Sequence, residues 1–201
     1  MMRKGNRFAK KPGKRALDAG FSLIEVMIAV VILTIGLLGL VGTFVTALQS
    51  TQWSQEDLIA KQKALEALES IYTARNTQQI TFQQVANISN GGIFTDGYTP
   101  MLAAGPDGLV GTADDTNFPG CSSGVECFPL PGPDGILGTA DDTQTSLAPF
   151  TRQILIGPVL QQPGNVPNPN LTQITVNVQY FRPGMRTPRT YTVNALMSAY
   201  R

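Results

Sequence analysis

The strongest hydrophobic pattern in the chain is an uninterrupted apolar stretch near its N-terminus. The 28 residues from Phe21 to Leu48 contain one charged side chain, Glu25, and no proline. An α-helix rises about 1.5 Å per residue, so roughly 20 residues cross the hydrocarbon core of a bilayer. Residues 21–48 are therefore predicted to form a membrane-spanning helix that carries a carboxylate close to its start.

After this stretch the pattern becomes amphipathic, and nothing in it breaks a helix. Leu58, Leu65 and Tyr72 recur every seven residues, with Leu68 and Ile71 beside them, and the next proline along the chain is Pro100. The spacing places these side chains on one face of a helix. The sequence therefore predicts that residues 49–76 continue the helix and pack this stripe against a sheet.

Two later segments have the composition of loops. Residues 77–150 are rich in Gly, Asn, Asp, Thr, Pro and Ser, which favour turns over regular structure. We therefore predict a loop-rich middle region with weak strands at most. Residues 161–170 contain three prolines among polar residues and are predicted to be an exposed connector.

Strand patterns appear in the last quarter of the chain. Residues 174–180 alternate apolar and polar side chains, residues 182–186 have the composition of a turn, and residues 190–195 resume the strand pattern. With a further strand at 153–156, residues 151–201 are predicted to form an antiparallel sheet. A long N-terminal helix packed on a small C-terminal antiparallel β-sheet is an α+β fold.

Charge separates the first 20 residues from the rest. Residues 1–20 carry seven bases and one acid, whereas the remaining residues carry eight bases and 13 acids. A basic segment before an apolar stretch is typical of export and membrane orientation, with the basic side in the cytoplasm. The bases that remain are too few for a broad phosphate-binding surface, so we expect no clear nucleic-acid partner.

The composition gives little support to an enzymatic function. The chain has no histidine, the residue that most often serves as a general base and that is common in zinc sites. It also lacks a phosphate-binding loop with its lysine and a glycine-flanked nucleophilic serine. We therefore expect a protein that is not an enzyme and has no catalytic residues.

Glu25 needs an explanation because a charged side chain inside a bilayer costs free energy. On insertion scales an acid at mid-membrane costs about 2.5–3.5 kcal/mol. One interpretation is that the acid lies near the interface, where its side chain reaches the polar region. The other is that it pairs with a specific cation inside an apolar assembly.

The residues around this acid resemble a known processing site. Gly20-Phe21-Ser22-Leu23-Ile24-Glu25, which follows the basic segment, is similar to the processing site of type IV prepilins and related pseudopilins. The resemblance implies that a prepilin peptidase cuts between Gly20 and Phe21, removes residues 1–20 as a cytoplasmic leader and methylates the Phe21 amine. It also implies that Glu25 pairs with the amine of an adjacent subunit, because a buried ion pair can fix the register of an assembly.

Within this family, residues 33–40 are most similar to PilV-type minor pilins, and minor secretion pseudopilins are the close competitor. The resemblance implies a pilin-like fold and a subunit of a type IV pilus, or alternatively of a type II secretion pseudopilus. Its implied partners are other pilin or pseudopilin subunits, the prepilin peptidase, the inner-membrane assembly platform and, before assembly, membrane lipid. The implied location is the inner membrane, crossed once with a cytoplasmic N-terminus, and then an extracellular or periplasmic filament.

Two other interpretations of the apolar stretch remain. A conventional signal-peptidase site at Val45-Thr46-Ala47 would remove the stretch, although it is longer than the usual core of about 7–15 residues in such signals. Alternatively, the span stays uncleaved and anchors a surface adhesin.

The middle of the chain contains a short duplication. GPDGLVGTADDT at residues 105–116 returns as GPDGILGTADDT at residues 132–143, identical at ten of twelve positions. Pro-Asp-Gly is a strong turn former, so one interpretation is a pair of tight turns. The other is calcium, which takes about six to eight oxygen ligands from carboxylate-rich loops. The candidate ligands are Asp107, Asp114, Asp115, Asp134, Asp141 and Asp142.

An alignment with the EF-hand loop covers half of such a calcium site. Asp107-Gly108 matches the central acid and glycine and Asp114 matches the closing acid, but Ala103 and Gly105 occupy the first two acid positions. The second repeat aligns in the same way. The missing ligands would have to come from the neighbouring Asp, from backbone carbonyls, from water or from the other repeat.

Cys121 and Cys127 lie between the two repeats and are the only cysteines of the chain. They lack the histidines or the second cysteine pair of a zinc site. Because the chain is predicted to be exported to an oxidising compartment, we expect a local disulfide between them.

Overall fold

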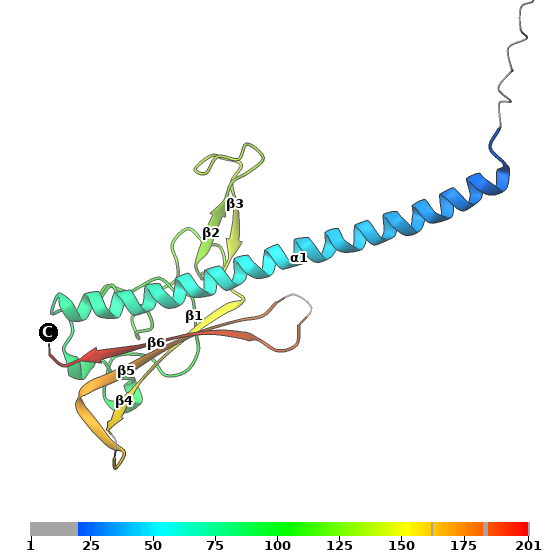
Figure 1. The fold of residues 1–201 in the computed structure, drawn as a ribbon. Helices are drawn as coiled ribbons and strands as arrows, with labels where there is room; N and C mark the ends of the chain where they lie inside the picture. Colours follow the sequence, from blue (N-terminus) through cyan, green and yellow to red (C-terminus); the bar gives the residue numbers. More distant parts are fainter. Residues whose placement is uncertain (1–19, 162, 183–184, 201) are drawn as a thin grey trace, which may run out of the picture. The chain divides into compact units, whose positions relative to one another are not determined.

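The computed structural model describes residues 20–161, 163–182 and 185–200 (Figure 1). It divides into two compact units, and the boundary between them falls between Gln49 and Ser50. One α-helix, α1 (Leu23–Asn76), passes through this boundary without interruption. The leader predicted at residues 1–20 lies outside the described residues except for Gly20, its last residue.

The first unit consists of the apolar part of α1. Its described side chains, from residue 20 to 49, are all exposed, and this part of the helix is long and apolar enough to cross a membrane. The hydroxyl groups of Thr34 and Thr43 donate to the carbonyls of Val31 and Leu40, at 2.8 and 2.7 Å. These bonds keep the polar groups satisfied within the helix, as a bilayer requires.

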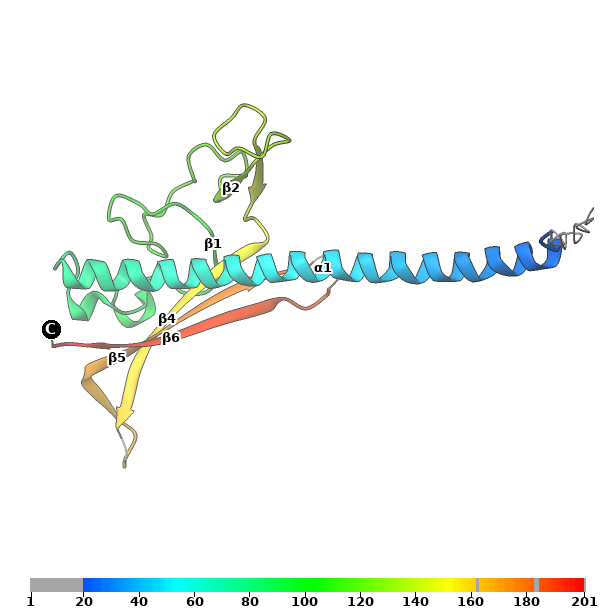
Figure 2. The same cartoon turned by 45° about the horizontal axis from the view of Figure 1, so that its top comes forward.

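The second unit contains a four-stranded antiparallel sheet in the order β1-β4-β5-β6. Its strands are β1 (Thr99–Pro100), β4 (Phe150–Gln161), β5 (Val166–Tyr180) and β6 (Arg189–Ser198). The second part of α1 lies along one face of this sheet (Figures 1 and 2). This arrangement of a long N-terminal helix and an antiparallel sheet is the predicted α+β, pilin-like fold.

The region between helix and sheet is loop-rich, as predicted. It contains two short 3₁₀ helices, η1 (Phe82–Gln84) and η2 (Ile88–Asn90), and one separate hairpin. The hairpin pairs β2 (Cys127–Leu130) with β3 (Thr143–Ser146), and the second repeat forms the loop at its end (Figure 1).

The connector predicted at residues 161–170 is wrong over half of its length. β4 ends at Gln161 and β5 already begins at Val166, which pairs with Gln161. The prolines of this segment fit a strand because β6 pairs with β5 only from Leu171 onward, so their missing N–H groups interrupt no bonds to β6. A register shift between Pro158 and Leu160 accommodates the irregular end of the sheet.

The predicted stripe of α1 is buried only in part: Ile71 is fully buried, and Leu68 and Tyr72 pack partly buried against the core. Leu58 and Leu65 are 55% and 42% exposed, and the face against the sheet carries small side chains instead. It consists of Ala60, Ala64, Ala67, Ile71 and Ala74, each at most 3% exposed. These residues recur at intervals of three and four, which is the true 3.6-residue period of a helix face. Alanine permits a close approach to the branched residues of the sheet, so this face of the helix packs without leucine.

Ionic contacts fix the helix on the sheet at two points. The buried Arg182 guanidinium, just after β5, donates to the Asp57 carboxylate at 2.9 Å, and the Tyr180 hydroxyl donates to the same carboxylate. One turn and a half further on, the buried Lys63 ammonium binds the carboxylates of Glu66 and Glu126. Glu126 immediately precedes β2, so Lys63 fastens the base of the hairpin to the helix.

The alanine face generates a prediction for the soluble unit beginning at Ser50. Ala67→Leu should lower the free energy of unfolding by about 1–3 kcal/mol, because the added carbons have no space between helix and sheet. Leu65→Ala, two residues away, should change it by no more than about 0.5 kcal/mol, because that side chain is largely in solvent. Urea unfolding followed by circular dichroism measures both free energies. A larger loss for Leu65→Ala than for Ala67→Leu would show that Leu65, and not Ala67, lies on the face that packs against the sheet.

Candidate functional site

The first turn of α1 presents Phe21 and Glu25 on an open surface. Ser22 caps the helix: its Oγ accepts a hydrogen bond from the Glu25 N–H at 3.2 Å, and its carbonyl accepts from the Val26 N–H, also at 3.2 Å. Serine is favoured at this position because it satisfies a backbone donor that the helix leaves free. The side chain of Phe21 is 82% exposed, so the Gly20–Phe21 peptide stands next to an accessible, well-defined helix start.

Glu25 is the one charged group in an apolar environment. A hollow of about 530 Å³ lies along these first turns, and it is lined by Phe21, Glu25, Val26, Ala29, Val30 and Leu33. Residues 20–49 contain no lysine or arginine. A cation that neutralises Glu25 in an apolar surrounding therefore has to come from outside the side chains of this segment. The predicted cleavage at Gly20–Phe21 would create an amino group close to this acid.

The two repeats fold in the same way, down to their individual hydrogen bonds. The Asp107 carboxylate accepts from the Leu109 N–H, and the Asp134 carboxylate accepts from the Ile136 N–H, both at 2.8 Å. The Thr112 hydroxyl donates to Asp114 at 2.7 Å, as the Thr139 hydroxyl does to Asp141 at 2.6 Å. The Gly111 N–H donates to Asp115 at 2.8 Å, as the Gly138 N–H does to Asp142 at 2.6 Å.

The glycines of the repeats are required by this shape. Gly108 and Gly135 have φ angles of +68° and +70°, a region that side chains with a Cβ rarely adopt. At Gly105 and Gly132 a Cβ would lie within 2.4 Å and 2.3 Å of the facing aspartates. Each repeat is thus a compact loop that is closed by its own aspartates.

This geometry bears on the calcium prediction. Within the described residues, no group of three or more His, Cys, Asp or Glu side chains converges as a metal site. Hydrogen bonds from Thr112 and Thr139 lower the pKa of the Asp114 and Asp141 carboxyls. A calcium ion would need further ligands from backbone carbonyls and water. Calcium binding by the repeats stays a prediction beside their turn-forming role.

The disulfide predicted between Cys121 and Cys127 is confirmed, with the two Cα atoms 5.9 Å apart. It closes a short loop immediately before β2. Because Glu126 lies inside this loop and binds Lys63 of α1, the disulfide also limits the motion of the hairpin's attachment to the helix. No feature of the cysteine spacing indicated this contact, which joins segments 63 residues apart.

Sequence reasoning missed the buried cations of the second unit. Arg152 on β4 is 2% exposed, and burial lowers its pKa, while the nearby carboxylates of Glu66, Asp115 and Glu126 raise it. Burial also raises the pKa of Asp115, whereas the hydrogen bond from the Gly111 N–H and the charge of Arg152 lower it by less. The two-residue period of a strand over residues 150–156 was the available signal, since it places Arg152 on the same face as Phe150 and Ile154.

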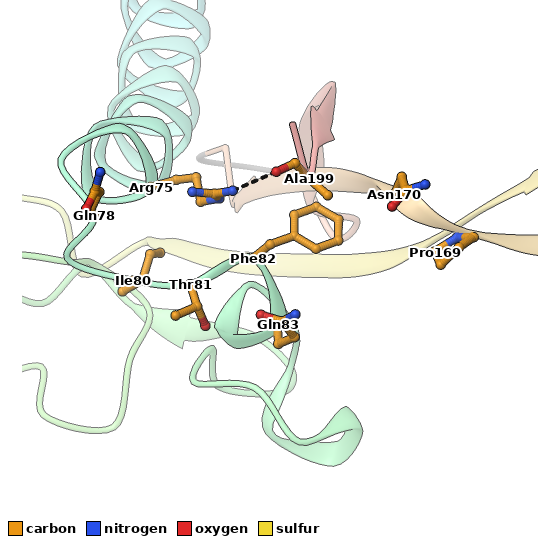
Figure 3. A pocket seen from close by; sticks show the side chains of 9 residues that line it. All are labelled: Arg75, Gln78, Ile80, Thr81, Phe82, Gln83, Pro169, Asn170 and Ala199. Atoms are coloured by element: carbon orange, nitrogen blue, oxygen red, sulfur yellow. Dashed lines mark hydrogen bonds between the residues drawn. The ribbon is translucent and has the colours of Figure 1, made fainter. Parts of the chain in front are cut away.

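A further hollow, of about 460 Å³, lies at the C-terminal end of α1 and was not anticipated (Figure 3). Arg75 projects toward the last described segment of the chain and donates from Nη2 to the Ala199 carbonyl at 3.0 Å. Its positive charge is also favourable at the C-terminal end of a helix. The contact ties the end of α1 to the segment after β6, so the role of Arg75 is structural.

Comparison with known proteins gives one match. A sequence model described as the prokaryotic N-terminal methylation motif matches residues 15–41. No curated protein and no solved structure matches the chain. The matched residues include the predicted cleavage site, Glu25 and about three quarters of the apolar segment 21–48. The motif supports a type IV prepilin-like protein with a pilin- or pseudopilin-like role, and it points to a structural subunit rather than an enzyme.

Proposed function

We propose that the chain is a minor pilin subunit of a type IV pilus. The observation that carries this proposal is the methylation motif over residues 15–41, which continues into an exposed helix long enough to span a bilayer. The fold adds to it, because the same helix continues into a compact unit that supplies a folded head. The finer similarity of residues 33–40 to PilV-type minor pilins supports a subunit present at low stoichiometry.

In this proposal the N-terminal site works in three steps. The apolar helix first holds the protein in the inner membrane, with its basic leader in the cytoplasm. The prepilin peptidase then removes residues 1–20 and methylates the new Phe21 amine. Glu25 finally pairs with the amine of an adjacent subunit. A carboxylate left unpaired among apolar side chains is costly, so misaligned subunits are disfavoured and the ion pair fixes the register.

A secretion pseudopilus subunit is the alternative within the same architecture. Both assemblies use the same processing site, so the N-terminal residues favour neither. Genes for pilus retraction and surface assembly beside the coding sequence would support the pilus, and genes for an outer-membrane secretin with secretion components would support the pseudopilus. An adhesin with an uncleaved anchor differs from both because its N-terminus stays intact.

Intact-mass measurement of the protein from its native membrane tests the processing step. We expect a mass lower by residues 1–20 and higher by one methyl group. A protein that begins at its original N-terminus would contradict the proposal and support an uncleaved anchor. A protein that begins near Gln49 would instead identify the apolar stretch as a removed signal sequence.

Glu25→Ala separates processing from assembly. The variant should still be cleaved, because Gly20 and Phe21 are unchanged, but its amount in sheared filaments should fall at least about tenfold, which corresponds to about 1.4 kcal/mol of lost interaction. Ser22→Ala provides a matched control, because it changes the helix cap within the same turn and keeps the acid. Normal incorporation of Glu25→Ala would contradict a docking role for the carboxylate.

Calcium binding is tested on the soluble unit that begins at Ser50. If the repeats hold the ion, chelator should lower the melting temperature and millimolar calcium should restore it, because a ligand that binds only the folded state stabilises that state. The double variant Asp114→Asn/Asp141→Asn should abolish the difference between the two conditions. A melting temperature that ignores both additions would assign the aspartates to turns alone.

A further inference from the structure

The two repeats form the same loop in opposite surroundings. In the first, Leu109 and Val110 are 1% and 6% exposed and belong to the hydrophobic core. In the second, the corresponding Ile136 and Leu137 are 60% and 59% exposed. Because each loop is closed by its own hydrogen bonds, the surroundings do not create its shape. The chain therefore contains a docked and an undocked copy of one structural element.

The docked copy shows what kind of surface this element fits. Gly111 of the first repeat packs so closely on Ile154 of β4 that a Cβ would lie 2.7 Å from the isoleucine Cδ1. The Thr95 N–H and hydroxyl both donate to the Gly111 carbonyl, at 2.8 and 2.9 Å. The buried Arg152 of β4 lies near enough for its charge to lower the pKa of Asp115, without a direct ion pair between the two among the described residues. The receiving surface combines an aliphatic floor, backbone donors and a guanidinium.

The undocked copy lacks each of these partners. Ile136 and Leu137 lie in the loop at the end of the β2–β3 hairpin, and Leu130 at the end of β2 is 47% exposed. The Asp142 Oδ1 atom is enclosed by the loop and has no hydrogen-bond partner among the described residues. Residues 127–151 carry three acids and no base, so the hairpin presents an apolar tip with a negative charge.

We propose that the second repeat, residues 132–143, is a docking element for a neighbouring filament subunit. The partner surface has the chemistry that the chain's own head offers to the first repeat: an aliphatic groove with an arginine or lysine at its rim. Ile136 and Leu137 enter the groove, and the basic side chain faces Asp142. This inference rests on the proposed function as a pilus subunit and names the contact that its head makes.

A second copy of the chain is a poorer partner for the same loop. Its surface for Leu109 and Val110 is already filled by its own first repeat. Its apolar hollow beside Ile80, Ile88 and Ile93 is lined also by Asp107 and Asp114. These carboxylates would repel Asp134 and Asp141 of an incoming loop, and like charges at close range disfavour an interface. Two further hollows of the head have no acid among the described residues that line them, but neither offers an available base. One is lined by no basic residue in that part of the chain, and Arg75 of the other is 9% exposed and donates to the Ala199 carbonyl. The charge of the hairpin is therefore matched better by a different subunit with a basic rim.

The test uses full-length protein in the cells that assemble the filament. Ile136→Asp/Leu137→Asp should be processed to the mature mass but should fall at least about tenfold in sheared filaments, as expected when central apolar anchors of an interface are lost. Thr145→Asp/Ala148→Asp adds the same charge at exposed positions in and just after β3, outside the repeat, and should be incorporated as the unchanged protein is. In detergent, both variants should keep the melting temperature of the unchanged protein.

Photo-crosslinking identifies the partner. p-Benzoyl-phenylalanine in place of Leu137 should give an adduct with another pilin subunit, and mass spectrometry of that adduct should place the link beside aliphatic residues and a lysine or arginine. The same amino acid in place of Ala148 should give no such adduct. An adduct only with a second copy, only with lipid or with a molecule outside the filament would overturn the proposal.

The outcomes separate this inference from the proposed function. If the unchanged protein is absent from sheared filaments, the pilus function fails and the docking proposal fails with it. If the unchanged protein and Ile136→Asp/Leu137→Asp enter filaments equally, the docking proposal fails while the pilus function stands. A variant that loses its melting transition would show that the loop supports the fold, and this result would also contradict a docking role.

Discussion

The structure depends on one backbone constraint: α1 satisfies its own hydrogen bonds over its whole length. A helix that needs no external backbone partners can be surrounded by lipid or other apolar helices in one part and by a sheet in another. The side chains then decide the environment. Large aliphatic residues cover the first part on every side, whereas alanines form a single face in the second. Glu25 is the exception in the first part, and its need for a cation links this helix to other molecules.

Buried charges perform the corresponding task in the second unit. Lys63, Arg152 and Arg182 are each at most 5% exposed. Lys63 and Arg182 form ion pairs with carboxylates, whereas the charges of Glu66, Asp115 and Glu126 act on Arg152 without a direct pair among the described residues. A buried ion pair adds little net stability, but the loss of one partner is strongly destabilising, so such pairs define which segments must meet. Through Lys63 and Glu126 they attach the β2–β3 hairpin to the helix, which positions the second repeat at the hairpin's free end.

The repeats show that a local shape and its role are separable. Five pairs of equivalent hydrogen bonds close the two loops identically, including the 2.9 and 3.0 Å bonds from Gly108 and Gly135 to the carbonyls of Gly105 and Gly132. One loop then contributes to the core and the other carries its aliphatic pair into solvent. An autonomous loop of this kind can serve as a packing element within the chain or as a contact between chains, depending on the surface it meets.

Local patterns in the sequence determined the long helix, its apolar first part, the alternating strands, the disulfide and the processing motif, because each depends on residues close together in the chain. The tertiary structure decided which face of α1 is buried. The sequence contains both a leucine stripe and an alanine stripe, and only the distance to the sheet distinguishes Leu65 from Ala67. It also decided the burial of Arg152 and the opposite burial of Leu109 and Ile136, since burial is a property of the segments that pack together and two nearly identical local sequences, aliphatic at both compared positions, do not encode different neighbours.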